Sequence, residues 1–245
     1  HGLLQLRNRP QWHTISGGSR TYVDRLSSQI RGTIIQNCAI QQVNRIGGRV
    51  ELLDCQGETR QFDHVVLACH ADQALKLLGD PHAEEIELLK HFRFVGNRVV
   101  LHSDTRLMPK RRGIWSCWNY MGTRSKIDNN LSVSYHMNQL QQLDTEQPMI
   151  VTVNPFIEPN NGLGHASFLY DHPLYDHHAI EAQKRLWFIQ GNQHTWYCGA
   201  WCGYGFHEDG LQAGLAVAEA LGQVRRPWNV DHMNDRLALP DNWAQ

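Results

Sequence analysis

This 245-residue sequence has no hydrophobic run near the roughly 18 residues that a membrane-spanning helix requires. It also has no secretory signal pattern of a basic stretch, an apolar segment and a small-residue cleavage site. Its charge is nearly balanced, because 23 Lys and Arg residues oppose 24 Asp and Glu residues and leave a formal net charge of −1. Such a chain has no long-range field to attract nucleic acid or an anionic membrane, so we expect a small or neutral ligand.

Cysteine is scarce, and the six cysteines show neither a paired disulfide framework nor the spacing of a closed zinc site. Most have apolar neighbours, which is typical of buried thiols, and we expect a reducing, cytoplasmic setting. Histidine is abundant, but its groupings lack metal-site spacing. We therefore predict no metal site and interpret these residues as surface or hydrogen-bonded core histidines; the groupings are His177-His178, His102 with Asp104, and Cys198 and Cys202 with His207.

Motifs for nucleophilic catalysis are missing as well. The sequence contains no G-x-S-x-G, no S-x-x-K and no G-x-x-x-x-G-K, which argues against a hydrolase or a P-loop enzyme. A G-x-G-x-x-G dinucleotide fingerprint is nearly formed by Gly203 and Gly205, but its third position is Glu208. The opening residue is His1 rather than Met, which suggests an excised or truncated product.

The sequence nevertheless has the composition of a folded protein, since 41% of its residues are hydrophobic and 19% are charged. A glycine turn at residues 16–19 predicts the start of a helix with apolar residues three and four apart. Gly47-Gly48 joins two alternating runs and predicts a β-hairpin. Residues 62–69 form an apolar run typical of a strand covered on both faces, and a helix is expected through residues 72–78.

The middle of the chain changes character. After a helix through residues 86–89, four short strands are expected as a second, antiparallel sheet, at residues 98–104, 113–121, 131–137 and 148–155. A helix follows at about residues 176–190. The strand at residues 195–201, the glycine-rich loop at 202–210 and the helix at 211–222 then occur in the order that holds a phosphate or a flavin edge at a helix start.

This last segment carries the main chemical signal. Gly199, Gly203, Gly205 and Gly210 allow the backbone to approach a planar ligand closely, although a glycine-rich turn without a ligand is the alternative. His207, Glu208 and Asp209 stand at the expected helix start, where Asp209 can serve as an N-cap, contact a flavin, or do both.

The run TWYCGAWCGYGFHEDGLQAGLAVAEALG resembles the final flavin-binding segment of the flavin-containing amine oxidase superfamily, and within it the bacterial branch of NAD/FAD-binding proteins. Other segments resemble that branch in the same order: RPQWHTISGGSRTYVDRL, FDHVVLACHADQALKLL, RVVLHSDTRLMPKRRGIWSCWNY, SVSYHMNQLQQL and IVTVNP. The resemblance covers most of the chain, and it implies a carboxy-terminal portion without the amino-terminal G-x-G-x-x-G that binds the FAD pyrophosphate.

The resemblance assigns residues to FAD by matching position. Gly17 and Gly18 match a glycine pair beside the flavin, Ile40 a position near the adenine, and Ala68 the pyrophosphate cleft. Gly199, Ala200, Asp209 and Gly210 match the segment at the ribityl chain and pyrimidine ring. Many relatives have an acidic residue at the position of Ala200, where it bonds the ribityl or phosphate region of FAD. The resemblance implies that Glu208 or Asp209 takes this role here or that the role is lost.

Aromatic residues suggest a substrate wall. Trp118 and Tyr120 share one face of their strand, and Tyr135 joins them if its strand is a neighbour; core filling is the alternative. In amine-oxidase relatives such a wall lines the substrate cavity, and Trp196 approaches it from the closing segment. The catalytic residues are not identified by the sequence.

We therefore predict an α/β (α+β) fold, the carboxy-terminal part of an amine-oxidase-like FAD-binding domain with an inserted mixed or antiparallel substrate sheet. Residues 1–80 are expected to belong to the FAD-binding domain, 81–190 to the substrate domain, and 191–245 to the closing segment and tail. The predicted activity of the intact protein is FAD-dependent oxidation of an amine or another activated C–H substrate, the fragment alone being inactive. The alternative is a non-catalytic ligand- or partner-binding module that does not hold FAD.

Overall fold

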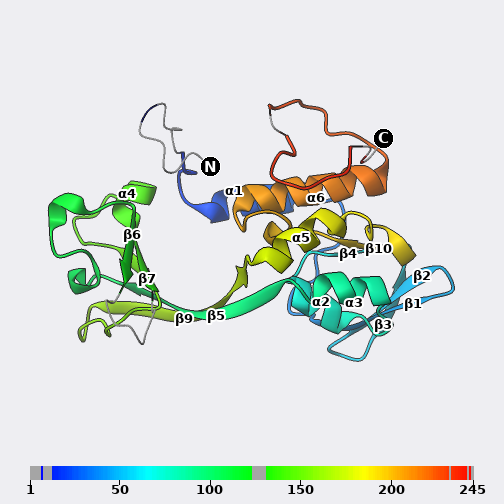
Figure 1. The fold of residues 1–245 in the computed structure, drawn as a ribbon, viewed down its shortest axis with the longest axis horizontal. Coiled ribbons are helices and arrows are strands. Elements are labelled where there is room, and N and C mark those ends of the chain that lie inside the picture. The colour runs from blue at the N-terminus through cyan, green and yellow to red at the C-terminus, as the bar shows by residue number, and fades with distance from the viewer. Residues whose placement is uncertain (1–6, 8–12, 123–130, 232, 242, 244–245) are drawn as a thin grey trace. The chain divides into compact units, whose positions relative to one another are not determined.

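The computed structural model describes residues 7, 13–122, 131–231, 233–241 and 243 (Figure 1). The chain forms two compact units, and each is described by itself. The first unit comprises His1–Ile34 and Gly96–Tyr170, and the second comprises Ile35–Val95 and Asp171–Gln245. The assignment of residues 1–80, 81–190 and 191–245 to functional domains remains a prediction.

The second unit begins with a three-stranded antiparallel meander. Strands β1 (Ile40–Ile46) and β2 (Arg49–Asp54) form the expected hairpin, and β3 (Thr59–Phe62) pairs with β2. The hairpin turn needs glycine because Gly47 and Gly48 have φ angles of +60° and +77°.

A parallel pair of short strands lies at the centre of the second unit. Strand β4 (Val65–Leu67) pairs in parallel with β10 (Thr195–Tyr197), so segments about 130 residues apart in sequence lie side by side. The helices of this unit are α2 (Ala71–Leu77), α3 (Ala83–Leu89), α5 (His177–Leu186) and α6 (His207–Gly222).

One hydrophobic core unites the second unit. It joins the meander, the parallel pair and the four helices, with Val43, Leu89, Leu186, Tyr197 and Val217 at most 2% exposed. This burial explains why each element turns its apolar positions inward. Val66 of β4 is 42% exposed, however, so the expectation of a strand covered on both faces is wrong for this residue.

The first unit contains a five-stranded sheet in the order β6-β7-β8-β5-β9. The pairs β6–β7, β7–β8 and β5–β8 are antiparallel, as expected. Two of the strands, β5 and β9, continue beyond the unit boundary into the second unit. The strands are β5 (Arg93–His102), β6 (Trp118–Gly122), β7 (Leu131–His136), β8 (Ile150–Val153) and β9 (Gly164–Leu174).

Short helices accompany this sheet. They are α4 (Met137–Gln141) and the 3-10 turns η1 (Thr105–Leu107) and η2 (Arg112–Ile114); two further turns, η3 (Asn192–His194) and η4 (Ala200–Cys202), belong to the second unit. Helix α1 (Ser19–Gln29) begins after Gly18, as expected. Its apolar residues Val23 and Leu26 remain 47% and 59% exposed in the described part of the chain.

Three details differ from the sequence-based expectation. Strand β6 begins only at Trp118, because η2 occupies part of the expected strand. Helix α6 begins at His207, four residues earlier than expected. Strand β9 was not expected, because its residues do not alternate and it contains Pro173. No helix in the described part of the chain has the length and hydrophobicity needed to cross a bilayer.

Candidate flavin site and substrate face

The carboxyl ends of β4 and β10 meet at one edge of the second unit. The Cys198 backbone N–H donates to the Leu67 carbonyl at 3.2 Å, and the Trp201 indole donates to the Cys69 carbonyl at 3.0 Å. These bonds bring the expected cofactor residue Ala68 beside the segment that starts at Gly199. Parallel sheets bind ligands at this edge, because the loops that leave neighbouring strands converge there.

The glycines of the following loop make close contacts with the chain itself. A Cβ atom at Gly199 would lie 2.7 Å from the Trp201 indole nitrogen, and one at Gly203 would lie 2.6 Å from an Asp209 carboxylate oxygen. Gly205 has a φ of +87°, and its Cβ would lie 2.7 Å from the Tyr175 hydroxyl. The fold therefore needs these three glycines whether or not a ligand is present.

Gly210 differs from these three glycines. Its backbone is helical, and an added Cβ would meet only Ala200, at 3.5 Å from the backbone nitrogen. This distance is ordinary van der Waals contact, so the fold tolerates a small side chain there. The position brings two of the expected cofactor residues, Ala200 and Gly210, into direct proximity.

Asp209 is fully buried at the third residue of helix α6, so the expectation that it is the N-cap residue is wrong: Phe206 holds that position. Its carboxylate accepts the Phe206 backbone N–H at 2.7 Å and forms an ion pair with Arg236, whose Nε lies 2.6 Å from Oδ1. The Arg236 guanidinium also lies over the rings of Tyr204 and Phe206, at 5.9 and 5.6 Å from their centroids. The carboxylate is thus committed to the helix start and to a cation that the sequence did not reveal.

The other two residues at the start of α6, His207 and Glu208, take no part in the ion pair of Asp209. Glu208 accepts a hydrogen bond from the Gln212 side chain at 2.9 Å, and His207 is exposed. Within the described residues, the backbone N–H groups of His207 and Glu208 make no hydrogen bond to the chain. The first amides of a 16-residue helix carry partial positive charge and suit an electron-rich ligand edge.

Tyr175 adds a polar atom at the same loop. Its hydroxyl is buried and has no hydrogen-bond partner within the described residues. Burial is the main cause that raises its pKa, and the Asp209 carboxylate adds to it, so the group is a neutral phenol. An orphaned hydroxyl beside Gly205, together with the free amides of α6, fits a polar ligand edge at this loop.

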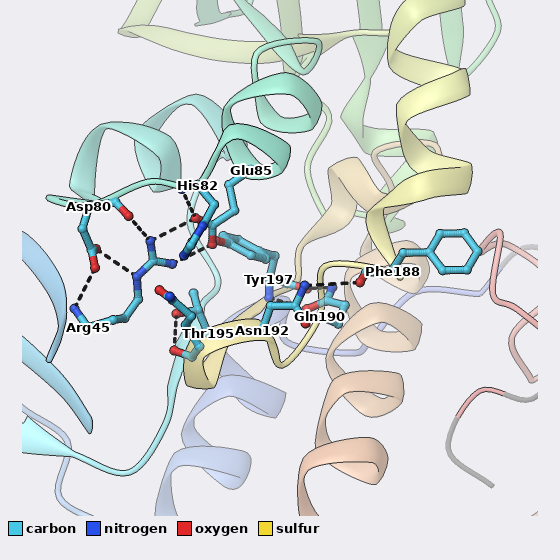
Figure 2. A network of polar contacts seen from close by, with 10 residues as sticks. Arg45, Asp80, His82, Glu85, Phe188, Gln190, Asn192, Thr195 and Tyr197 are labelled. Carbon is cyan, nitrogen blue, oxygen red and sulfur yellow. Dashed lines mark hydrogen bonds and ion pairs between the residues drawn. The ribbon is translucent and has the colours of Figure 1, made fainter. Parts of the chain in front are cut away.

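A buried ionic network holds β10 in place (Figure 2). Arg45 reaches Glu85 with Nη1 at 2.6 Å and Nη2 at 3.0 Å, and its Nε donates to Asp80 at 2.9 Å. The Tyr197 hydroxyl donates to Glu85 at 2.6 Å. The Arg45 and Glu85 side chains are each only 3% exposed. The meander, α3 and β10 are therefore tied together by one charge cluster.

The pKa values in this network follow from burial and pairing. Burial raises the pKa of Glu85, but the hydrogen bonds from Arg45, Tyr197 and the His82 backbone outweigh it, so the pKa lies below the ordinary 4.5. Burial, followed by the bond to Glu85, raises the pKa of Tyr197. The cluster therefore consists of a charged carboxylate, a charged guanidinium and a neutral phenol.

Glutamine side chains position the closing segment. Gln183 donates to the carbonyls of Trp201 and Gly203 at 2.9 and 2.5 Å. Gln190, labelled in Figure 2, both donates to and accepts from the Tyr197 backbone at 2.7 and 2.8 Å. Neither glutamine could be found from the sequence, because nothing in a helical pattern marks a buried polar residue that bonds a distant loop.

The other expected cofactor residues lie at separate places. Ile40 opens β1 and is opposite Asp54. Gly17 and Gly18, with φ angles of +83° and +81°, precede α1 in the first unit. They line a hollow of about 590 Å³ with residues 13–16 and 141–143. Their role toward FAD remains a prediction.

The expected substrate residues of the first unit lie together on its sheet. Trp118 is directly opposite Tyr135, and Tyr120 is opposite Val133 on the same two strands. Tyr120 is 68% exposed. Trp196 belongs to the second unit, where its indole nitrogen lies 3.4 Å from His64 Nδ1 and its ring packs against Gly191. Their role in substrate binding remains a prediction.

The histidine and cysteine groupings that the sequence analysis weighed lie in separate surroundings. Within the residues that the structure describes, no three His, Cys, Asp or Glu side chains are placed to hold a metal ion. Cys202 is buried beneath the loop, and burial raises the pKa of its thiol. His102 and Asp104 belong to a hydrogen-bonded network in the first unit.

Comparison with protein families identifies the chain. Residues 4–151 match the model of the flavin containing amine oxidoreductases. The chain belongs to this family. No curated protein sequence matches it.

Several solved structures have a fold similar to that of this chain. A protein titled protoporphyrinogen oxidase from Exiguobacterium sp. 255-15 has a TM-score of 0.60 at 14% identity, covering 83% of this chain and 51% of its own. A putrescine oxidase variant has a TM-score of 0.57 at 9% identity, covering 85% and 53%. A UDP-galactopyranose mutase has a TM-score of 0.53 at 10% identity, covering 83% and 50%. The chain therefore spans about half the length of these structures, and the likeness concerns the fold.

Proposed function

We propose that the intact protein is an FAD-dependent oxidoreductase that oxidises an amine or another activated C–H substrate. Family membership supports a flavin, which would accept the substrate's hydride once bound. This chain would supply position, exclusion of water and electrostatics.

The observation that carries this proposal is the convergence at the carboxyl ends of β4 and β10. Ala68, Gly199 and the start of α6 meet there, and the free amides of His207 and Glu208 offer two hydrogen bonds to an electron-rich edge. Donors fixed in advance stabilise negative charge that grows on a ring during reduction. Asp209 adds no unpaired charge at this place, because Arg236 neutralises it.

The rival proposal is a non-catalytic module that holds a ligand or partner without FAD. It is favoured by the lack of a pyrophosphate-binding G-x-G-x-x-G in this chain. We expect this chain by itself to bind FAD weakly or not at all, with little quenching of flavin fluorescence in a titration.

The test is flavin content of the full-length protein after incubation with FAD and gel filtration, read from its absorption spectrum. The informative pair is Gly210→Val and Gly214→Val. Both changes carry the same helix cost, but Gly210 faces the Ala200 backbone at 3.5 Å whereas Gly214 has no atom within 4 Å.

We expect Gly210→Val to lower the flavin content or the reduction potential and Gly214→Val to leave both unchanged. Thermal melting of both variants separates loss of cofactor from loss of fold. A wild-type protein that never retains flavin would contradict the proposal and favour the rival. Equal flavin content in the two variants would place the contact elsewhere.

A further inference from the structure

The segment that follows α6, named here the C-terminal segment, returns along that helix. Its described residues, 223–231, 233–241 and 243, contain no helix or strand. Side chains fix it to α6 instead. Arg226 pairs with Glu219 near the end of the helix, with Nε 2.6 Å from Oε1, and the Trp243 indole donates to the Ala216 carbonyl at 3.2 Å. Arg236 reaches the other end of α6, where the candidate flavin site lies.

Arg236 holds the first turn of α6 with both its side chain and its backbone. Its guanidinium grips the Asp209 carboxylate with Nε 2.6 Å from Oδ1 and Nη2 3.1 Å from Oδ2. Its backbone N–H donates to Gln212 Oε1 at 3.2 Å, and the Gln212 amide in turn donates to Glu208 at 2.9 Å. One residue of the C-terminal segment therefore fixes both carboxylates of this turn.

The loop before α6 rests on the same guanidinium. The Arg236 cation lies over the rings of Tyr204 and Phe206, and Asp209 Oδ2 accepts the Phe206 backbone N–H at 2.7 Å. The next residue is His207, whose backbone N–H is one of the two amides that the candidate flavin site offers. Arg236 thus sets the position of this amide through its contacts with Asp209 and Phe206.

The ion pair also decides the charge at this place. Asp209 is fully buried, and its carboxylate bonds the residue directly before the His207 amide. An unpaired buried carboxylate there would oppose negative charge that grows on a nearby ring. Because Arg236 neutralises the carboxylate, the partial positive charge of the helix start remains effective.

We infer that Arg236 is a positioning residue for the flavin, which acts through Asp209 and favours the reduced, more negatively charged cofactor over the oxidised one. This inference rests on the proposed function, for which it names a residue that raises the reduction potential. An ion pair that only stabilised the fold would not distinguish the two redox forms.

The experiment measures the reduction potential of the flavin in the full-length protein loaded with FAD, against a reference dye. Arg236→Gln leaves the Asp209 carboxylate charged without this cation. We expect it to weaken binding of reduced relative to oxidised flavin by about tenfold, which lowers the potential by about 30 mV for a two-electron couple. Arg236→Lys retains the charge but not the two-atom grip, so it should restore most of the potential.

Asp209→Asn tests the sign of the effect. It removes the anion and leaves the Arg236 cation at the site, so the potential should rise above that of wild type. A purely structural role would shift the potential of Arg236→Gln and Asp209→Asn in the same direction. If Arg236→Gln does not fold, a potential of Asp209→Asn at or below the wild-type value still overturns the inference.

Arg226→Gln is the matched control. Arg226 also belongs to the C-terminal segment and grips Glu219 through two atoms, and the two side chains are only 4% and 10% exposed. Glu219 lies about 15 Å from Asp209 along the helix axis. Arg226→Gln should therefore lower the melting temperature, as Arg236→Gln does, and leave the potential unchanged.

An unchanged potential in Arg236→Gln, or an equal fall in Arg226→Gln, would overturn the inference. Retained flavin whose potential does not respond to Arg236→Gln or Asp209→Asn would contradict the inference alone. A wild-type protein that never retains flavin would contradict the proposed function, and the inference with it.

Discussion

Replacement of Glu85 by glutamine tests whether the buried ionic network stabilises the second unit. Glu85 receives both Nη groups of Arg45, the Tyr197 hydroxyl and the His82 backbone N–H. The introduced glutamine side chain would be neutral. Its amide nitrogen is a hydrogen-bond donor, so it would meet the donors that now bond to the Glu85 carboxylate and could not accept a bond from them. Arg45, with a side chain 3% exposed, would keep only the partly exposed Asp80 as a carboxylate partner.

The expected cost follows from burial. Removing one partner of a buried ion pair costs about 3–5 kcal/mol, and we expect about 3 kcal/mol because the glutamine carbonyl still accepts one bond. This loss corresponds to a fall in melting temperature of roughly 6–12 °C for a chain of this size. Tyr197→Phe removes one hydrogen bond to the same carboxylate and should cost about 2 kcal/mol.

The assay is urea unfolding followed by fluorescence and circular dichroism. Glu87→Gln is the matched control, because Glu87 lies on the same helix, is 50% exposed and pairs with Lys90. Its unfolding midpoint should stay close to that of wild type, because an exposed ion pair contributes little to stability. A Glu85→Gln loss no larger than that of the control would refute the reasoning.

The contribution of Glu85 to the free energy of unfolding also depends on pH. The folded-state pKa of Glu85 lies below its ordinary value of 4.5, so its contribution is fully present above pH 4.5. It is lost as pH falls through the folded-state pKa. The difference between wild type and Glu85→Gln should therefore shrink in acid and stay constant between about pH 5 and 7. A difference that grows in acid would contradict this assignment.

Three further predictions concern other sites. Burial lowers the pKa of His102 below 6.5, so stability should fall by up to about 1.4 kcal/mol per pH unit below that value, and His102→Gln should flatten the curve measured by urea unfolding. Gly205→Ala should cost about 1–3 kcal/mol, because Gly205 has a positive φ and an added Cβ would contact the Tyr175 hydroxyl. Gly214→Ala should stabilise the protein by about 0.5–1 kcal/mol, because Gly214 lies in open space on α6. Equal melting temperatures of the two variants would contradict this prediction. Asp209→Asn should cost about 3 kcal/mol by leaving Arg236 without its carboxylate, and a wild-type unfolding midpoint would show that the pair is not stabilising.

The sequence by itself determined the local structure where short-range physics decides. The Gly47-Gly48 turn requires positive φ, and the alternation around it therefore predicted the hairpin. Helix periodicity predicted α1, α2, α3, α5 and α6, and the ordered motifs predicted the amine oxidoreductase family and its mixed α/β fold. The sequence placed Asp209 at the start of α6 but assigned it the N-cap position, which Phe206 holds; the Asp209 carboxylate instead accepts the Phe206 backbone N–H from inside the helix.

Only the tertiary structure decided which distant groups meet. The parallel pairing of β4 with β10 brings Ala68 beside Gly199. The network of Arg45 and Glu85 and the bond from Arg236 to Asp209 have no sequence signature. Each depends on side chains that lose water together when separate segments pack. The cost of that desolvation is offset only by partners that the three-dimensional fold supplies.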